Sequence, residues 1–430
     1  MSAALTAPAA PAASTAPAPA AAPALTMREK LGYGAGGAGG AFPSMGGVYF
    51  FDAIFVVTLG LSPALLGTLG VLFRFWDAAT DMAMGWLSDN TRTRWGRRRP
   101  YILAGAVGTA LVMPLIWLVE PGWSMTSIIA WFIGAQLLLL LFNTIWNIPY
   151  QCLLMEVTPD SVQRTRVAAY RQYFSTAAWL AMGWAWMLAQ HSVFADADGN
   201  PNLIRGAFWI TVAAALVVLV TGALPALLCR ERLYRAAAPA AKNSLRADLR
   251  LTFSNRAFLW LVACTLLFWL GTQAKGGLAF YTKLYLVCGG DQQLAAKIAG
   301  LEGTIILGVG LLSIPVFEWI ARRHGKRAAL LVIMWLVLGA SLSTWFTYTP
   351  RYPYLSMLSG VLLAPANSAV WVLLPSLLGD VIDLDELRTG ERRDGSFSAI
   401  FSWIFKLGQS VAVGLSGWLV AAAGFVPGLK

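Results

Sequence analysis

The sequence predicts an all-α polytopic membrane protein, and three observations carry this prediction. Of the 430 residues, 57% are hydrophobic and only 12% are charged, which is far too apolar for a soluble domain of this length. Apolar stretches of roughly 20 residues, long enough to cross a bilayer as helices, recur along the chain. Arginine and lysine gather in the short segments between them, as in loops that orient helices in a membrane. The net charge of +11 therefore indicates the lipid bilayer as a partner, and not nucleic acid.

Taken in order, the apolar stretches give about eleven spans, six before a basic connector and five after it. Because two-part transporters usually have matched halves of six spans, we expect two six-helix bundles with the last helix absent from the chain. The expected organisation is a disordered Ala/Pro-rich tail (1–25), an N-terminal bundle (26–228), a cytoplasmic connector (229–256) and a C-terminal bundle (257–430). The predicted spans are Tyr33–Leu59, Pro63–Ser88, Tyr101–Val119, Ser127–Tyr150, Val167–Gln190, Ala207–Leu228, Ala257–Val287, Leu294–Ile320, Ala328–Tyr348, Tyr354–Leu378 and Phe397–Phe425.

The basic clusters fall in alternate loops, which predicts that these loops and the N-terminus lie on the cytoplasmic side of an inner (plasma) membrane. Two basic segments, WGRRRPYIL (Trp95–Leu103) and HGKRAALLV (His324–Val332), lie between the second and third spans of their halves. This repeat, with the long connector, favours a two-bundle transporter over a channel. A membrane enzyme would need an acid/base or metal constellation, yet the two histidines, His191 and His324, lie in separate loops. We therefore expect no enzyme activity.

Charged residues inside the second span are the strongest functional signal. Arg74, Asp77 and Asp81 stand at i, i+3 and i+7, so they share one helical face. Two carboxylates one turn apart repel each other, so a proton, a metal cation or a basic group is expected between them. Na⁺ would draw on oxygen ligands such as the hydroxyl of Thr80, whereas H⁺ would need one carboxylate only. Both ions remain open, as does a purely structural salt bridge from Arg74 to Asp77.

Basic residues also occur inside later spans, at Arg171, Lys275 and Lys406. Each has small or polar neighbours and could face a wet central cavity. Lys275 could equally extend toward the membrane surface, whereas Lys406 lies too deep in its span for that. Glu302 and Asp52 are weaker candidates, because either could merely neutralise Lys275 or Arg74.

Two charged loops are predicted to act as a cytoplasmic gate. In GWLSDNTRTRWGRRRP (Gly85–Pro100), Asp89 would pair with loop arginines such as Arg97 and Arg98 and lock the two bundles together. The segment GDVIDLDELRTGERRDGS, which includes Asp380 and Asp383, is the matching loop of the second half. The alternative, not exclusive, is that these charges only fix the orientation of the helices.

Several longer segments resemble a known family. They are KLGYGAGG, RFWDAATDMAMGWLSDNTRTRWGRRRPYIL, NIPYQCLLMEVTPDSVQRTRVAAYRQ, VWVLLPSLLGDVIDLDELRTGERRDGSFSAI and the lysine of FSWIFKLGQS. In these the chain resembles the glycoside–pentoside–hexuronide cation symporters of the major facilitator superfamily. The resemblance implies the major facilitator fold and symport of a small sugar or glycoside with Na⁺ or H⁺, without another cofactor. Animal lysophospholipid transporters share part of the pattern, so a lysolipid or other amphipathic solute is the alternative substrate. The oligomeric state is open, with a monomer expected.

The resemblance also assigns site residues. The coupling cation would be held by Asp77, Thr80, Asp81 and Thr144, and the two aspartates would be metal ligands only if the ion is Na⁺. The substrate would be bound at the matching positions Asn147, Gln151, Arg171, Trp371 and Lys406. Apart from the resemblance, we expect Lys275 and Ser402 to line the same site.

Departures from the family pattern bear on the substrate. Carboxylates that grip sugar hydroxyls in sugar-transporting members are replaced here at Ala41 and Asn147, and an aromatic residue is replaced by Gln151. With Arg171 and Lys406 retained, the pocket is more positive and favours a ligand with its own negative charge. We expect an anionic sugar such as a hexuronide.

Overall fold

The computed structural model describes residues 25–120, 122–158, 161–196, 199, 201–231, 254–389 and 394–423. Within these ranges the chain is helical apart from short connections and one isolated bridge between Ala195 and Pro201. Nearly all of the predicted tail, and residues 232–253 of the predicted connector, lie outside the described residues.

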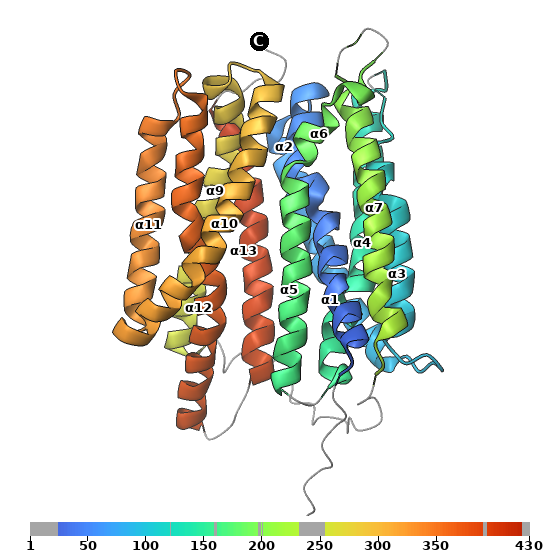
Figure 1. Ribbon diagram of the computed structural model, residues 1–430, viewed down its shortest axis with the longest axis vertical. Helices are drawn as coiled ribbons and strands as arrows, with labels where there is room; N and C mark the ends of the chain where they lie inside the picture. The colour runs from blue at the N-terminus through green and yellow to red at the C-terminus, as the bar shows by residue number, and fades with distance from the viewer. Residues whose placement is uncertain are drawn as a thin grey trace, which may run out of the picture.

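The first group of helices runs from the N-terminal side to the connector, coloured blue to green in Figure 1. Its first helix continues beyond Ala41 through a 3₁₀ turn and two π-helical segments, Gly46–Phe50 and Asp52–Thr58. The helices are α1 (Met27–Ala41), α2 (Pro63–Asn90), α3 (Arg99–Val112), α4 (Met125–Val157), α5 (Ser161–Gly183), α6 (Ala185–Ala189) and α7 (Leu203–Leu228).

The second group, yellow to red in Figure 1, lies beside the first. Its first helix continues through the π-helical segment Thr282–Val287. The helices are α9 (Arg256–Tyr281), α10 (Gln292–His324), α11 (Lys326–Thr347), α12 (Met357–Thr389) and α13 (Asp394–Ala422).

The predicted polytopic membrane fold is confirmed. Eight helical segments of the described chain are long and apolar enough to cross a membrane. The long helices α2, α5 and α13 stand among them, at the positions of the remaining predicted spans. Helix α2 contains Arg74, Asp77 and Asp81, and these charges lower its hydropathy where the site lies.

Local sequence explains where the helices begin. Thr26 and Glu29 form a reciprocal capping box at the start of α1, which satisfies amide groups that the first turn leaves free. Asn202, Asn255 and Asp291 accept backbone N–H groups in the same way at the starts of α7, α9 and α10.

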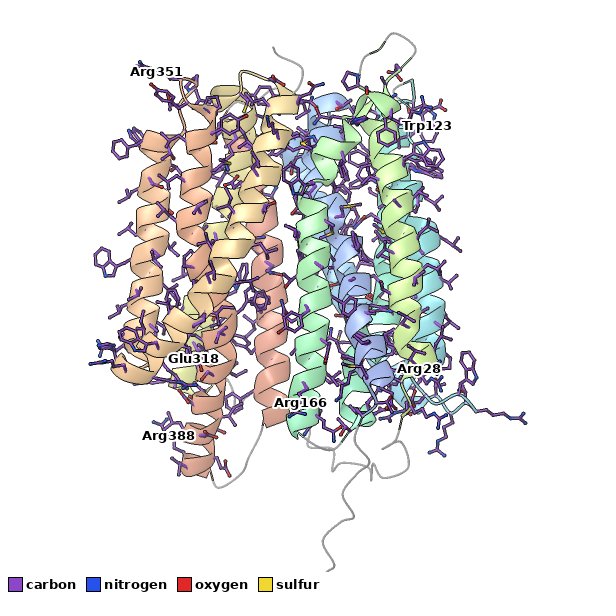
Figure 2. The ribbon with its side chains drawn as sticks, viewed as in Figure 1. Arg28, Trp123, Arg166, Glu318, Arg351 and Arg388 are labelled. Carbon is purple, nitrogen blue, oxygen red and sulfur yellow. The ribbon has the colours of Figure 1, made fainter. Side chains whose placement is uncertain are left out.

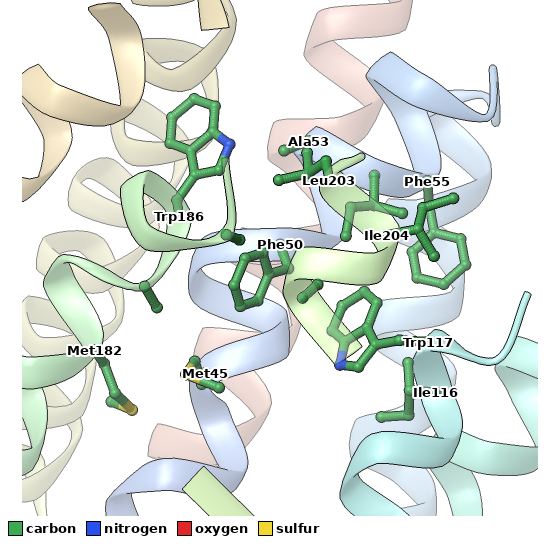
Figure 3. Packing of buried hydrophobic residues seen from close by; sticks show 14 of the residues in the cluster. Met45, Phe50, Ala53, Phe55, Ile116, Trp117, Met182, Trp186, Leu203 and Ile204 are labelled. Atoms are coloured by element: carbon green, nitrogen blue, oxygen red, sulfur yellow. The ribbon is translucent and has the colours of Figure 1, made fainter. Parts of the chain in front are cut away.

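The apolar core of the first group gathers around the irregular continuation of α1. Phe50 packs edge-on against Trp117 with 5.4 Å between ring centroids, and both side chains are buried. Figure 3 shows these two residues with Phe55, Ile116 and Ile204 close by. Large buried side chains therefore hold the backbone at the point where regular α-helix gives way to wider turns.

Several arginines lie at one end of the molecule. Figure 2 shows Arg28, Arg166 and Arg388 at the lower end, which we call the basic end. Trp123 and Arg351 lie at the upper end, which we call the opposite end.

Among the described residues, four hydrogen bonds join the two groups of helices in the half nearer the opposite end. Helices α2 and α13 also approach closely there, because a side chain at Gly417 would overlap the carbonyl oxygen of Pro63. The bonds run from Trp418 to Thr68 (3.1 Å), from Trp184 to Thr304 (3.0 Å), from Gln190 to the carbonyl of Gln292 (3.2 Å) and from Tyr281 to Asp52 (2.7 Å). The molecule is thus closed at the opposite end.

Candidate cation and substrate site

The structure brings the four predicted cation-binding residues together between α2 and α4. The hydroxyl of Thr144 on α4 lies 3.4 Å from Asp77 Oδ1 and 3.2 Å from Asp81 Oδ1. Thr80 Oγ1 lies 3.4 Å from the same hydroxyl. Thr144 is buried and the Asp77 side chain is only 13% exposed. One face of α2 therefore presents both carboxylates to a single hydroxyl of α4.

Thr80 has a second role in the helix itself. Its hydroxyl donates to the carbonyl oxygen of Trp76 at 2.9 Å, a bond that threonines often make inside helices. Of the two threonines, Thr144 is therefore the one aimed at both carboxylates.

The ion pair between Arg74 and Asp77 is present but lies within a single helix. Its closest N–O distance is 3.9 Å, and the Arg74 side chain is 44% exposed. Such an exposed pair three residues apart contributes little stability and joins no helices to each other. It therefore does not explain why a second carboxylate, Asp81, stands one turn further along.

The oxygen atoms at this site fit a hard monovalent cation or a proton. Carboxylate and hydroxyl oxygens are the donors that hard cations prefer. The described residues contain no group of three or more His, Cys, Asp and Glu side chains that could hold a metal ion. The site therefore relies on two acids and hydroxyl groups, which suits a weakly held ion.

Two predicted substrate residues lie directly beyond the cation site on α4. Gln151 Nε2 donates to Asn147 Oδ1 at 3.0 Å, so the two amides act as one polar unit. Asn147 follows Thr144 by three residues, which places it on the adjoining turn of the same face.

Arg171 is held by an aromatic stack. Its guanidinium lies over the Tyr150 ring at 5.7 Å from the centroid. Tyr150 in turn stacks on Tyr33 at 4.6 Å and on Trp146 at 4.5 Å. The Tyr150 and Tyr33 hydroxyls each donate to the other residue's carbonyl oxygen, at 2.9 Å and 3.3 Å. The backbone and rings beneath Arg171 are therefore rigid, while Arg171 itself stays exposed.

Trp371 stands in a cluster of aromatic residues in the second group. Its ring lies 5.6 Å from those of Trp269 and Phe405, and 57% of its surface stays exposed. Two further predicted substrate residues, Ser402 and Lys406, are on α13, but their side chains lie outside the described residues.

Lys275 on α9 is hydrogen-bonded within the second group of helices. Its ammonium donates to the carbonyl oxygen of Ala340 on α11 at 3.0 Å. The cavity that it lines contains none of Asn147, Gln151, Arg171 and Trp371. The structure thus separates Lys275 from the predicted substrate residues that it describes.

The two weaker acids each bind a partner that we did not expect. Glu302 forms its direct ion pair with Lys283, with 2.5 Å between Oε2 and Nζ, and its negative charge also acts on Lys275. Asp52 accepts from the Tyr281 hydroxyl and does not neutralise Arg74. In both cases the partner comes from another segment of the fold, which spacing along the chain does not reveal.

At the basic end, Glu156 at the end of α4 pairs with both predicted gate arginines. Arg97 Nε and Arg98 Nε donate to its Oε1 at 2.9 Å and 2.7 Å. Its side chain is 8% exposed and that of Arg98 is 6% exposed. Asp89 was the acid that we expected, and its side chain lies outside the described residues. In the sequence, Glu156 follows the predicted fourth span on the same side of the membrane as the loop arginines. This position is the signal by which it could have been found.

Glu231, just after α7, also binds this loop. Its carboxylate accepts the backbone N–H groups of Arg97, Arg98 and Arg99 at 2.8, 2.9 and 3.1 Å. These amides stand at the start of α3, where a negative charge is stabilised by unpaired N–H groups and the helix dipole.

The second group has a comparable ion pair. Lys326, which lies in the repeated segment HGKRAALLV at the start of α11, contacts both carboxylate oxygens of Asp380 on α12 at 2.7 Å. Asp383 is one turn further along α12 and is exposed. The weak sequence repeat therefore marks equivalent ion pairs, each joining the third helix of its half to the fourth.

Comparisons with known proteins agree with this architecture. The family described as MFS/sugar transport protein matches residues 32–430. Several relatives cover nearly the whole chain. Three of them are the putative glycoside/cation symporter YagG of Escherichia coli (25% identical, over 92% of this chain and 83% of the relative), the glucuronide carrier protein homolog of Escherichia coli (24%, 94% and 85%) and the sodium-dependent lysophosphatidylcholine symporter 1-A of Danio rerio (24%, 94% and 80%).

Solved structures share the fold. A bacterial homolog of the human lysosomal transporter Spinster, inward-facing and unoccupied, has a TM-score of 0.70 at 13% identity over 93% of this chain and 84% of that chain. The D-xylose–proton symporter has a TM-score of 0.63 at 15% identity over 92% and 91%. Since the family matches all but the first residues, the chain belongs to the MFS/sugar transport protein family and is a multi-pass membrane transporter, not an enzyme.

Proposed function

We propose that this protein is a secondary active transporter that couples symport of a sugar or glycoside to Na⁺ or H⁺ by alternating access. The convergence of Asp77, Asp81 and Thr144 carries the proposal, because it places two acids and a hydroxyl at one point inside the membrane. Intramembrane carboxylates are costly and usually functional. The symporter names of the relatives support the same conclusion.

Coupling follows from the position of the amides on α4. A cation between Asp77 and Asp81 draws on Thr144, and Asn147 stands on the next turn of the same helix. A bound cation thus holds in place the turn of α4 that contacts the substrate. A ligand and a cation that both bind this helix better in one conformation stabilise each other's binding.

The substrate is an anionic sugar such as a hexuronide. Amides at Asn147 and Gln151 hydrogen-bond hydroxyl groups without adding negative charge, and Arg171 supplies a fixed positive charge beside them. Arg171 and Lys406 would bind a carboxylate through charge-assisted hydrogen bonds, and Trp371 would lie against the sugar ring. A lysolipid is the alternative, supported by the lysophosphatidylcholine symporter among the relatives.

Transport would alternate between closure at the opposite end and closure at the basic end. The four hydrogen bonds at the opposite end support closure there. Asp89, Arg97, Arg98, Asp380 and Asp383 would form the gate at the basic end. The pairs of Arg97 and Arg98 with Glu156, and of Lys326 with Asp380, each lie within one group of helices, so closure there would require new contacts between the groups. We place the basic end and the N-terminus in the cytoplasm, the protein in the inner membrane, and assign a monomer as the transporting unit.

Uptake into proteoliposomes tests the proposal. A labelled glucuronide should accumulate when a Na⁺ or pH gradient is imposed, and its neutral methyl ester and a lysophosphatidylcholine should not. Accumulation of the lysolipid alone would establish the alternative. Glucuronide uptake that is the same with and without the Na⁺ and pH gradients would contradict cation coupling.

A further inference from the structure

A cavity of about 300 Å³ lies near the opposite end, apart from the cation site. It is a partly open cavity lined mainly by residues of α9, α10 and α12, and Trp186 of α6 borders it from the first group of helices. Its polar and aromatic lining includes Lys275, Lys283, Glu302, Trp186 and Tyr348.

The lining carries an excess of positive charge. Two lysines and one glutamate are its charged residues. Glu302 is bound to Lys283, and both side chains are largely buried, at 12% and 17% exposed. Lys283 also lies over the Tyr348 ring at 5.6 Å from the centroid. The single acid of the cavity is therefore already engaged.

The ammonium group of Lys275 has more hydrogen-bond donors than the one that binds Ala340. An ammonium group has three donors, and one of them is used on the carbonyl oxygen of Ala340 at 3.0 Å. A cation in a bundle interior is stabilised chiefly by a paired anion. The remaining donors thus favour a negatively charged group in the cavity.

The rest of the lining suits a sugar ring. Trp186 and Phe280 both border the cavity and pack on each other at 5.4 Å between ring centroids, with Trp186 buried and Phe280 half-buried. Aromatic rings beside a few polar groups are typical of small-molecule sites, whose volumes begin at about 300 Å³. The volume therefore suits a monosaccharide and is too small for a lysolipid with its acyl chain.

We propose that this cavity is a second binding site, for a compact sugar acid whose carboxylate is bound by Lys275. The proposal rests on the proposed function for the class of ligand, but it places the ligand at a site other than the one beside Arg171. Because Trp186 belongs to the first group of helices and the other lining residues to the second, opening at this end would separate the walls. A ligand held between them would favour the closed form.

Titration calorimetry of the purified transporter with glucuronate, in chloride-free buffer, tests this site. Wild-type protein should bind glucuronate at two sites. Lys275→Gln should weaken one of them by roughly 10- to 150-fold, the loss expected of one charge-assisted hydrogen bond. Lys275→Arg should retain both sites. Lys297→Gln, an exposed lysine on α10 that does not line the cavity, should change neither.

The outcomes separate this proposal from the proposed function. Two unchanged sites in Lys275→Gln would overturn the cavity site and leave the anionic transport substrate in place. A second contrary result is that wild-type protein binds glucuronate at a single site, which is lost in Arg171→Gln and kept in Lys275→Gln. This result would also overturn the cavity site and leave the anionic transport substrate in place. No glucuronate binding to wild-type protein would overturn both. If chloride at the same concentration as glucuronate displaces glucuronate from the Lys275-dependent site, the site binds inorganic anions in general. This result would contradict the proposal.

Discussion

The Tyr281 hydroxyl donates a hydrogen bond of 2.7 Å to a carboxylate oxygen of Asp52, and this bond joins the two groups of helices near the opposite end. Asp52 begins a π-helical segment after α1, and Tyr281 is the last residue of α9. Tyr281 is buried with Val56 and Val420, so little water competes for the bond. Hydrogen bonds to charged groups are worth about 1.5–3 kcal/mol, enough to bias a two-state equilibrium strongly.

Tyr281→Phe should therefore shift the transporter toward the form that is open at the opposite end. Nitroxide labels on Trp123→Cys and Arg351→Cys, with the native cysteines replaced, would report the separation of the two groups by electron paramagnetic resonance. We expect a new population at longer distance. Tyr354→Phe, at an exposed tyrosine of the same end, is the matched control. Identical distance distributions in both variants would show that the bond does not hold this end closed.

The carboxylate pair on α2 should be required for cation-driven accumulation of the substrate but not for exchange of the substrate across the membrane. Asp77→Asn or Asp81→Asn should abolish gradient-driven accumulation, because an amide neither offsets a cation's charge nor exchanges a proton. Exchange of substrate down its own gradient should survive. Uptake and counterflow in proteoliposomes measure the two activities, with Glu318→Gln at the exposed end of α10 as the control. Cation-stimulated accumulation at the wild-type level in both mutants would refute the assignment.

The two threonines at the cation site should differ in effect. Thr144→Val removes the hydroxyl that faces both carboxylates, at a cost of about 1 kcal/mol or roughly a five-fold rise in the cation concentration for half-maximal transport. Thr80→Val should change this value less, because the Thr80 hydroxyl is bonded to the Trp76 carbonyl. A cation titration of initial uptake rates would rank the two. A larger effect at Thr80 would contradict the proposed ligand role of Thr144.

The ion pairs at the basic end should differ in their contribution to stability. Glu156→Gln leaves the buried guanidinium of Arg98 and that of Arg97 without this carboxylate, and breaking a buried pair costs about 3–5 kcal/mol. Asp380→Asn breaks a pair whose side chains are 56% and 34% exposed, which is worth about 0–1 kcal/mol. Thermal denaturation in detergent should therefore show a large loss for Glu156→Gln and a small one for Asp380→Asn. Equal losses of thermal stability in the two variants would mean that burial does not determine how much each ion pair stabilises the protein.

Substrate charge should be recognised by the basic residues and not by the aromatic one. Arg171→Gln and Lys406→Gln should weaken binding of a sugar acid by roughly 10- to 150-fold and binding of its neutral ester far less. Trp371→Ala removes only stacking area and should weaken both ligands alike. Calorimetric titration of each variant with the acid and its ester would measure this selectivity. Equal losses for both ligands in Arg171→Gln and Lys406→Gln would show that the site does not recognise negative charge.

Sequence alone predicted the helices well, since a bilayer imposes one length and one composition on every span. The predicted span Pro63–Ser88 and the observed α2, Pro63–Asn90, differ by two residues at one end. The shared face of Asp77 and Asp81 was predictable for a similar reason, because it follows from helical periodicity. Thr144 was linked to them only by family resemblance, and its contact with both carboxylates comes from the packing of α4 against α2.

The sequence by itself determined a polytopic helical protein, the carboxylate pair on one helical face and the repeated basic segments of the two halves. Tertiary structure alone decided which polar side chains meet: Glu156 with Arg97 and Arg98, Glu302 with Lys283, and Tyr281 with Asp52. The physical reason is that helical periodicity fixes neighbours three or four residues apart, whereas these partners lie 19 to 229 residues apart. Their meeting depends on which helices pack together and at what depth, and close contacts such as that of Gly417 with Pro63 set those distances.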